Sequence, residues 1–201
     1  MTDARLHADS VLRNRTPILA VLRPVLAGVR SVLEVASGTG GHVAHLAAAL
    51  PHVTFQPSDP SPQARASIDA WAATEGLGNV RPALALDAAS PPWPVPPTDA
   101  VVCINMVHIS PWSATLGLLR GAAALLAPGG VLYLYGPYRR AGVDTAPGNL
   151  AFDASLRARD PAWGLRRLEE VAEAARAAGF SAPATHDMPA NNLSVLFTRE
   201  G

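Results

Sequence analysis

Residues 31–42, SVLEVASGTGGH, place a carboxylate in an apolar run and follow it with a glycine-rich turn. Glu34 is the charged residue of the run, and Gly38 and Gly40 lie in the turn. Glycines let the backbone pass close to a ligand, and the start of a following helix favours negative charge. This stretch therefore predicts a ligand-binding turn at the end of a buried strand.

Two further carboxylates, Asp59 and Asp87, lie where later strands are expected to end. A carboxylate at the second strand end can accept both hydroxyls of a ribose, and one at the third can accept an adenine amino group. A turn-capping role explains either aspartate alone. Three acids at three successive strand ends together favour a nucleoside-like ligand.

The elements that must position these residues follow from the hydrophobic pattern, in which strands alternate with helices. Strands are expected over residues 32–36, 53–57, 80–86, 99–105, 131–135, 184–188 and 193–198. Helices are expected over residues 10–27, 42–50, 62–74, 110–126 and 166–178. Pro17 and Pro24 predict that the first helix is divided or kinked. Residues 137–165 are expected to be irregular.

The last two expected strands are joined by residues 189–192, a link too short for a parallel crossover, so the final strand should run antiparallel. We predict an α/β fold with a doubly wound, seven-stranded, mostly parallel sheet, forming a single domain over residues 1–201. Residues 1–28 are expected to form a helical lid, and residues 137–165 a substrate-side insertion.

The composition narrows the class of partner. Sixteen basic and sixteen acidic residues give a formal net charge of zero, which does not favour binding to a nucleic-acid backbone. No apolar run reaches membrane-spanning length, and the N-terminus lacks the apolar core of a signal peptide. Cys103 is the single cysteine, which fits a reducing compartment. We expect a cytoplasmic protein that acts on a small molecule and has no nucleic-acid or membrane partner.

Two types of glycine-rich turn compete. The dinucleotide-binding pattern Gly-x-Gly-x-x-Gly fits Gly38 and Gly40, but Val43 stands at its third position. With Glu34 ahead of it, the turn resembles the first motif of class I S-adenosylmethionine-dependent methyltransferases, in which Ala36 here replaces a glycine. Their cofactor is a cation without a pyrophosphate, which suits an acidic pocket better than NAD does. An ordinary tight turn is the remaining alternative.

The resemblance extends along nearly the whole chain. Residues 99–112 and 125–137 resemble two later methyltransferase strands with their flanking loops. Residues 152–166, with the motif Asp-Pro-Ala-Trp-Gly, and residues 188–193, with Met-Pro-Ala-Asn-Asn, resemble one branch in particular. That branch is a methyltransferase-like family catalogued as a domain of unknown function.

The resemblance implies transfer of a methyl group from S-adenosyl-L-methionine to a small molecule, with S-adenosyl-L-homocysteine as product. Expected cofactor contacts are Arg13, Asn14, Glu34, Ala36, Ser37, Gly38, Thr39, Gly40, His42, Asp59, Asp87, Ala88, Asn105 and Met106. Expected substrate contacts are Trp112, Tyr138, Arg157, Trp163, Arg166, Asn191 and Asn192. Gly41 and Arg167 depart from the usual residues of this family, which affects substrate contacts rather than the fold.

His108 follows the fourth expected strand and is the candidate catalytic residue. A general base, a ligand contact and a structural role all remain open for it. Arg157 and Arg166 can clamp an anionic substrate group, which suggests a negatively charged acceptor. They can equally pair with Asp153 and Asp160, and ion pairing is the expected fate of at least one.

No metal site is expected. His42 and His45 lie three residues apart, but no third ligand has suitable spacing. Two rival functions stay open beside the methyltransferase. One is an NAD-dependent oxidoreductase, and the other is a non-catalytic protein that binds S-adenosylmethionine without transferring its methyl group.

Overall fold

The computed structural model describes residues 3–201, so the first two residues of the expected lid lie outside the described part. The chain is grouped into two compact units. Unit 1 contains the described residues up to Asp87 together with Thr98–Val102. Unit 2 contains Ala88–Pro97 and Cys103–Gly201. Each unit is described by itself below.

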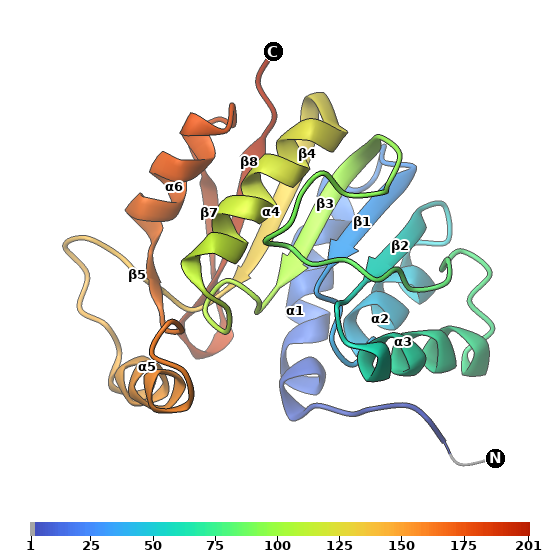
Figure 1. Cartoon of the computed structure of the whole chain (residues 1–201), viewed down its shortest axis with the longest axis horizontal. Helices are drawn as coiled ribbons and strands as arrows, with labels where there is room; N and C mark the ends of the chain where they lie inside the picture. The colour runs from blue at the N-terminus through green and yellow to red at the C-terminus, as the bar shows by residue number, and fades with distance from the viewer. Residues whose placement is uncertain (1–2) are drawn as a thin grey trace. The chain divides into compact units, whose positions relative to one another are not determined.

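Strands and helices alternate through most of the chain (Figure 1). The strands are β1 Ser31–Val35, β2 Thr54–Ser58, β3 Thr98–Ile104, β4 Leu126–Gly136, β5 Tyr138–Arg139, β6 Arg166–Arg167, β7 Ala184–Met188 and β8 Asn192–Thr198. The helices are α1 Asp9–Val25, α2 Gly41–Ala49, α3 Pro62–Thr74, α4 Trp112–Leu125, α5 Pro147–Arg159 and α6 Leu168–Ala177, with a short 3-10 turn at Pro189–Asn191.

Six strands form one mostly parallel sheet in the order β2-β1-β3-β4-β8-β7. In unit 1, β1 and β2 are parallel, with Ser31 opposite Thr54. In unit 2, β8 runs antiparallel to β4, with Val131 opposite Thr198, and antiparallel to β7. The α/β class and the antiparallel last strand are therefore confirmed.

The third predicted strand, residues 80–86, is not a continuous strand. Two isolated parallel bridges join it to β2, Phe55 with Val80 and Ser58 with Leu84. Pro82 lies between the two bridges and has no N–H to donate to a ladder. The sheet therefore has six strands rather than the seven predicted.

Unit 1 contains helices α1, α2 and α3, with α2 packed between the other two. Helix α3 has the predicted bounds, and its start is specified locally: Ser61 Oγ accepts from Ala64 N, and Pro62 occupies the first turn. Helix α1 is one element through Pro17, so the predicted division into two helices is wrong, and a kink at the proline stays a prediction. Ile18 and Leu22 are fully buried beyond the proline, and this packing offsets the lost hydrogen bond.

Unit 2 contains a helix that the sequence analysis did not predict. Helix α5 lies within residues expected to be irregular and is seen end-on in Figure 1. Its buried residues are Asn149, Asp153 and Leu156, whereas Leu150 and Phe152 are exposed. The buried face is mostly polar, so apolar periodicity carries no signal for this helix.

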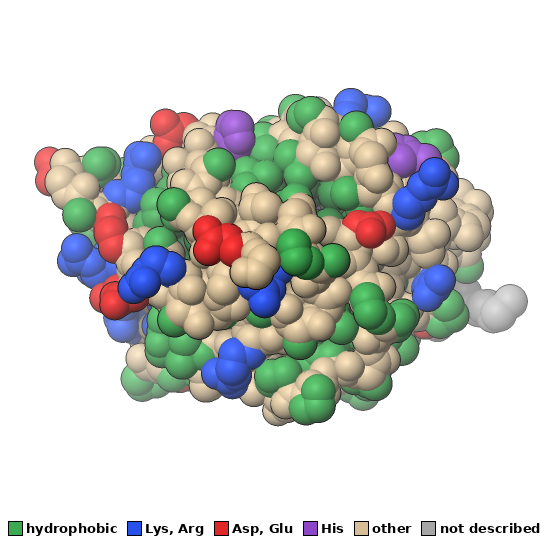
Figure 2. Space-filling view, turned by 90° about the horizontal axis from the view of Figure 1, so that it is seen from above, with side chains coloured by type: hydrophobic (Ala, Val, Ile, Leu, Met, Phe, Trp, Pro, Cys, Tyr) green, Lys and Arg blue, Asp and Glu red, His purple; other side chains and the backbone are tan. Residues whose placement is uncertain are grey.

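Charged side chains of both signs are spread over the face of the molecule in Figure 2, singly or in mixed groups. Every basic residue is an arginine. Within residues 3–201, none of the helices has both the length and the hydrophobicity needed to cross a bilayer.

Candidate functional site

The glycine turn of unit 1 joins β1 to α2 in an unusual backbone conformation. Ala36, Gly38 and Gly40 have positive φ angles of 57°, 58° and 85°. A Cβ atom on Gly40 would lie 2.7 Å from the Cα atom of Ile68 in α3, so close packing requires this glycine. A Cβ on Gly38 would meet no atom within 4 Å. The turn is therefore held on its α3 side and open at Gly38, where a ligand could approach.

Glu34 is buried at the end of β1, with 2% of its surface exposed. Its Oε2 atom has no hydrogen-bond partner among the described residues. Burial raises the pKa of Glu34, hydrogen bonding to Ser37 opposes this rise and the charge of Asp59 adds to it, so that the pKa is about 7. The Glu34 carboxyl therefore holds its proton more readily than an exposed carboxyl does, and one of its oxygens is available to a donor.

Asp59 ties the glycine turn to the start of α3. Its Oδ2 atom accepts from Gly38 N at 3.0 Å and its Oδ1 atom accepts from Ser61 N at 2.9 Å. The turn-capping role that explains an isolated aspartate is therefore present here. Each carboxylate oxygen has further lone pairs, so ribose binding stays a prediction for Asp59.

The N-terminal segment is also connected to the glycine turn. Ser67 Oγ donates to the carbonyl of Thr39 and accepts from Leu6 N, each at 2.7 Å. Trp71 Nε1 donates to the carbonyl of Leu6 at 3.1 Å. This chain of hydrogen bonds holds the segment before α1 against α3 and the turn, and the lid role of residues 1–28 stays a prediction.

His42 and His45 lie on α2, and the Nε2 atoms of both lack a partner among the described residues. Burial lowers the pKa of His42 to about 4, with smaller contributions from the charges of His45 and Arg15. The His42 ring is therefore neutral at pH 7, and burial also lowers the pKa of the half-buried His45. Among residues 3–201, no group of three or more metal-binding side chains is gathered at one place.

Other predicted cofactor residues occupy varied positions. Arg13 on α1 and Asp87 are exposed, and Asn14 is half-buried. Asn105 at the end of β3 has a positive φ of 63° and donates from its backbone N to Tyr135 O at 2.8 Å. Ala88, Met106 and Ser37 are buried. None of these positions by itself tests cofactor binding.

His108 of unit 2 is buried, with 4% of its surface exposed. Its ring packs edge-on against Phe152 of α5, and a Cβ atom on Gly136 would lie 2.8 Å from its Nδ1 atom. Burial, together with the positive charge of Arg166, lowers the pKa of His108 to about 4. The imidazole is therefore neutral at pH 7 and is a weak base.

The Asp-Pro-Ala-Trp-Gly motif folds against the segment that carries His108. Asp160 Oδ1 accepts from Ala162 N at 2.8 Å and shapes the loop. Gly164, with a φ of 137°, donates from its N to the carbonyl of His108 at 3.0 Å. Arg166 donates to three backbone carbonyls and lies 5.8 Å from the Trp112 ring centroid.

Asp153 gathers two arginines on the inner side of α5. It accepts from Arg139 Nη2 at 2.6 Å and from Arg157 Nε at 3.1 Å. Its Oδ1 atom accepts from Leu165 N at 2.7 Å. Ion pairing of Arg157 is therefore confirmed, and both Arg157 and Arg166 have partners within the chain. An anionic acceptor can no longer be argued from these two side chains.

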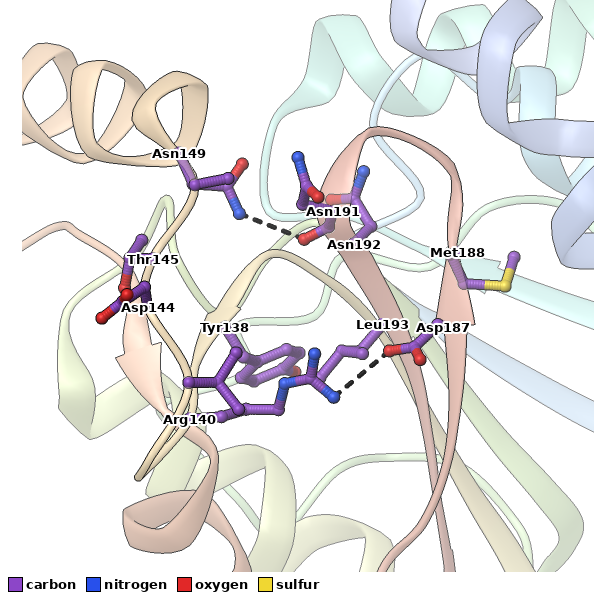
Figure 3. Close-up of a pocket in the computed structure, with 12 residues that line it drawn as sticks. Tyr138, Arg140, Asp144, Thr145, Asn149, Asp187, Met188, Asn191, Asn192 and Leu193 are labelled. Atoms are coloured by element: carbon purple, nitrogen blue, oxygen red, sulfur yellow. Dashed lines mark hydrogen bonds and ion pairs between the residues drawn. The ribbon is translucent and has the colours of Figure 1, made fainter.

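A cavity of about 290 Å³ lies in unit 2 between the segment that leads into α5 and the link between β7 and β8 (Figure 3). Its lining contains Tyr138, Arg140, Val143, Asp144, Thr145, Ala146, Asn149, Asp187, Met188, Asn191, Asn192 and Leu193. Tyr138, Asn191 and Asn192 were predicted as substrate contacts. Trp112, Arg157, Trp163 and Arg166 do not line it.

Asn149 is the lining residue that the sequence analysis missed most clearly. Its Nδ2 atom donates to the carbonyl of Asn191 at 3.1 Å, and its side chain is buried. The available signal was the spacing of Asn149, Asp153 and Leu156, which places all three on one side of a helix. That spacing indicates a buried helix face only if polar residues are counted as possible members of such a face.

In sequence, residues 5–199 match the family described as "Protein of unknown function (DUF938)". The chain belongs to the DUF938 family. The match covers both units of this DUF938 protein and includes the glycine turn, the Asp-Pro-Ala-Trp-Gly motif and the Met-Pro-Ala-Asn-Asn motif. The family description assigns no activity.

The DUF938 chain shares its fold with solved methyltransferases. An O-methyltransferase family protein from Burkholderia thailandensis has a TM-score of 0.82 and 20% identity, over 96% of this chain and 58% of that one. Human N-acetylserotonin methyltransferase in complex with SAM has a TM-score of 0.76 and 14% identity, over 94% and 52%. PigF with SAH has a TM-score of 0.78 and 18% identity, over 91% and 55%. The chain thus spans little more than half of these proteins, and at these identities the likeness shows the fold.

Proposed function

We propose that this DUF938 chain binds S-adenosyl-L-methionine and transfers its methyl group to a small molecule. The observation that carries the proposal is the buried carboxyl of Glu34, whose Oε2 atom lacks a partner, beside a turn that is open at Gly38. A buried acceptor needs a donor, and a cationic ligand with hydrogen-bond donors supplies one. The fold shared with methyltransferases supports the same choice.

The residues of unit 1 fit this cofactor better than they fit NAD. A dinucleotide needs donors and positive potential for its pyrophosphate, whereas Glu34 and Asp59 provide carboxylate acceptors at the turn. In this proposal Glu34 accepts from the cofactor's donor groups, and Asp59 accepts from its ribose while it holds Gly38 N. When bound, S-adenosylmethionine supplies a methyl group that a nucleophile takes by in-line displacement.

On the acceptor side, unit 2 contributes the cavity of Figure 3. His108 is not among its lining residues, and its buried ring is neutral at pH 7, so its expected role is to hold the segment after β3 in place rather than to remove a tightly held proton. Holding an acceptor atom in line with a methyl donor accounts for much of the rate in such displacements.

A thermal unfolding scan with S-adenosylhomocysteine, S-adenosylmethionine and NAD tests the cofactor assignment. A ligand at 100 times its dissociation constant stabilises a protein by about 2.7 kcal/mol, or about 5–10 °C for a chain of this size. We expect this shift with both sulfur compounds, a smaller one in Glu34→Gln, and the wild-type response in the control Glu173→Gln on the exposed face of α6. A shift with NAD alone would establish the oxidoreductase instead.

The non-catalytic alternative is separated by a second experiment. The protein is incubated with methyl-labelled S-adenosylmethionine and a mixture of small metabolites, and the label is followed into new products. Label in a product that depends on intact protein identifies an enzyme. Cofactor binding without any transfer, across metabolite mixtures of varied origin, would favour the binding protein.

A further inference from the structure

We propose that the cavity of about 290 Å³ in unit 2 is the acceptor site and that it recognises its ligand by a small amine group that is protonated at neutral pH. The protonated nitrogen has no lone pair, so it serves for recognition, and a different nucleophilic atom of the ligand takes the methyl group. The name "acceptor site" rests on the proposed methyl transfer. The preference for an amine rests on the lining of the cavity alone.

A hydrogen bond and an ion pair lie at the two ends of the cavity (Figure 3). At one end, Asn149 Nδ2 of α5 donates to the carbonyl of Asn191 at 3.1 Å. At the other, Arg140 Nη1 and Asp187 Oδ1 of β7 form an ion pair at 3.2 Å. Both contacts join the segment before and at the start of α5 to the β7–β8 hairpin, so the space between them is held open by two separate parts of unit 2.

Two asparagine side chains of the lining have their amide donors in use and their amide oxygens without a donor. The amide groups of Asn149 and Asn192 donate to the carbonyls of Asn191 and Pro189. Within residues 3–201, no group donates to the side-chain oxygens of these two asparagines. Asp144 adds a carboxylate on the same lining. A ligand that satisfies these oxygens must therefore be rich in donors, as an ammonium group with three N–H bonds is.

The charges of the lining favour a cation over an anion. Arg140 is the basic residue of the lining, and its charge is offset by Asp187. Asp144 then leaves the lining with a net negative charge. The apolar side chains of Met188 and Leu193 can cover the carbon skeleton of the amine. An anion would have to displace Asp187 from Arg140 and lie near the Asp144 carboxylate.

The test uses three probes of matched size: 2-phenylethylamine, 2-phenylethanol and phenylacetate. The side-chain amide signals of Asn149 and Asn192 are followed by NMR in the full chain as each probe is added. We expect the amine to move both signals and to bind more tightly than the carboxylate. Asp144→Asn should weaken amine binding by about threefold, the effect of one exposed charge contact, and leave the alcohol unchanged.

Glu173→Gln removes one acidic charge from an exposed face outside the cavity and should change none of the three affinities. Because Asp144 is exposed, Asp144→Asn should fold normally, and a thermal scan checks this. The proposal is overturned if phenylacetate binds as tightly as the amine, or if no probe moves either asparagine signal. If the amine binds as expected but S-adenosylhomocysteine does not stabilise the protein, the amine site stands and the methyltransferase proposal fails.

Discussion

Arg166 Nη2 donates to the backbone carbonyl of Ser110 at 2.6 Å, and Arg166 Nε donates to the backbone carbonyl of Val107 at 3.2 Å. Ser110 and Val107 lie on opposite sides of His108 in the sequence. One guanidinium on β6 thus holds the chain on both sides of His108. Gly164 N adds a third hydrogen bond, to His108 O itself. The Asp-Pro-Ala-Trp-Gly motif and the arginine after it therefore have a structural task, which is to fix the segment that follows β3.

Replacing Arg166 by lysine should release this segment. Lysine keeps the charge but cannot present the planar set of donors that reaches Val107, Ser110 and Ala162 together. We expect a loss of about 1–3 kcal/mol in the free energy of unfolding, measured by urea denaturation. Arg167→Lys, at the exposed neighbouring position, is the control and should be within about 0.5 kcal/mol of wild type. Equal stability of the two variants would contradict this account.

The two glycines of the cofactor turn should respond differently to alanine. At Gly40 a Cβ would meet the backbone of Ile68 at 2.7 Å as well as adopt a positive φ, so Gly40→Ala should cost more than about 2 kcal/mol. At Gly38 the space is open, so only the φ cost of about 1 kcal/mol applies.

Urea denaturation measures both costs, and S-adenosylhomocysteine titration measures the effect on the proposed site. Gly38→Ala should weaken binding of the cofactor product because a methyl group then covers the open side of the turn. A Gly38→Ala variant with unchanged affinity would show that no ligand approaches the turn at this residue.

Glu34→Gln should change the pH dependence of stability. The pKa of Glu34 is raised to about 7 in the folded chain from 4.5, so its contribution is fully present below pH 4.5 and is lost as the pH rises through 7. Glutamine stays neutral and removes this loss. The stability of the variant relative to wild type should therefore rise by about 3 kcal/mol between pH 4 and pH 8.5.

Urea denaturation of both proteins across this pH range makes the comparison, with Glu173→Gln as a control on α6. A relative stability that stays flat, or that falls with pH, would show that the Glu34 carboxyl is ionised in the folded chain at pH 7.

The His108 ring should stay neutral down to about pH 5. Burial and the charge of Arg166 lower its pKa to about 4 from 6.5, so its contribution to stability is present above pH 6.5 and is lost as the pH falls through 4. NMR titration of the ring protons, assigned with His108→Gln, measures the pKa directly. A methyl-transfer rate that falls below pH 6.5 because His108 becomes protonated would require a higher pKa and would restore the general-base role.

Local chemistry let the sequence predict much of unit 1. Helix α3 has the predicted bounds because Ser61 and Pro62 specify its start within four residues of chain. The apolar run of β1, its closing Glu34 and the glycines of the turn were likewise recognised from their own neighbours. Such features depend on contacts a few residues apart, so short stretches of sequence contain the information.

Unit 2 was harder to predict because its decisive contacts join residues far apart in the chain. Helix α5 was not predicted because its buried face carries Asn149 and Asp153, whose hydrogen-bond partners lie in other segments of the chain. An apolar buried face would have been recognised from its helical periodicity. The role of Arg166 could not be predicted from the sequence, because a guanidinium can bind an anionic ligand as well as a set of backbone carbonyls.

The sequence by itself therefore determined the α/β alternation, the antiparallel last strand, the glycine turn and the family. The tertiary structure decided which charges are satisfied within the chain and which acceptors are left for a ligand. Arg157 and Arg166 are in the first group, and the oxygens of Asn149, Asn192 and Asp144 at the cavity are in the second. The reason is that a polar group's function depends on whether folding gives it a partner. Two of the three carbonyls that Arg166 binds, and the carbonyl that Asn149 binds, lie 40 or more residues away in the chain.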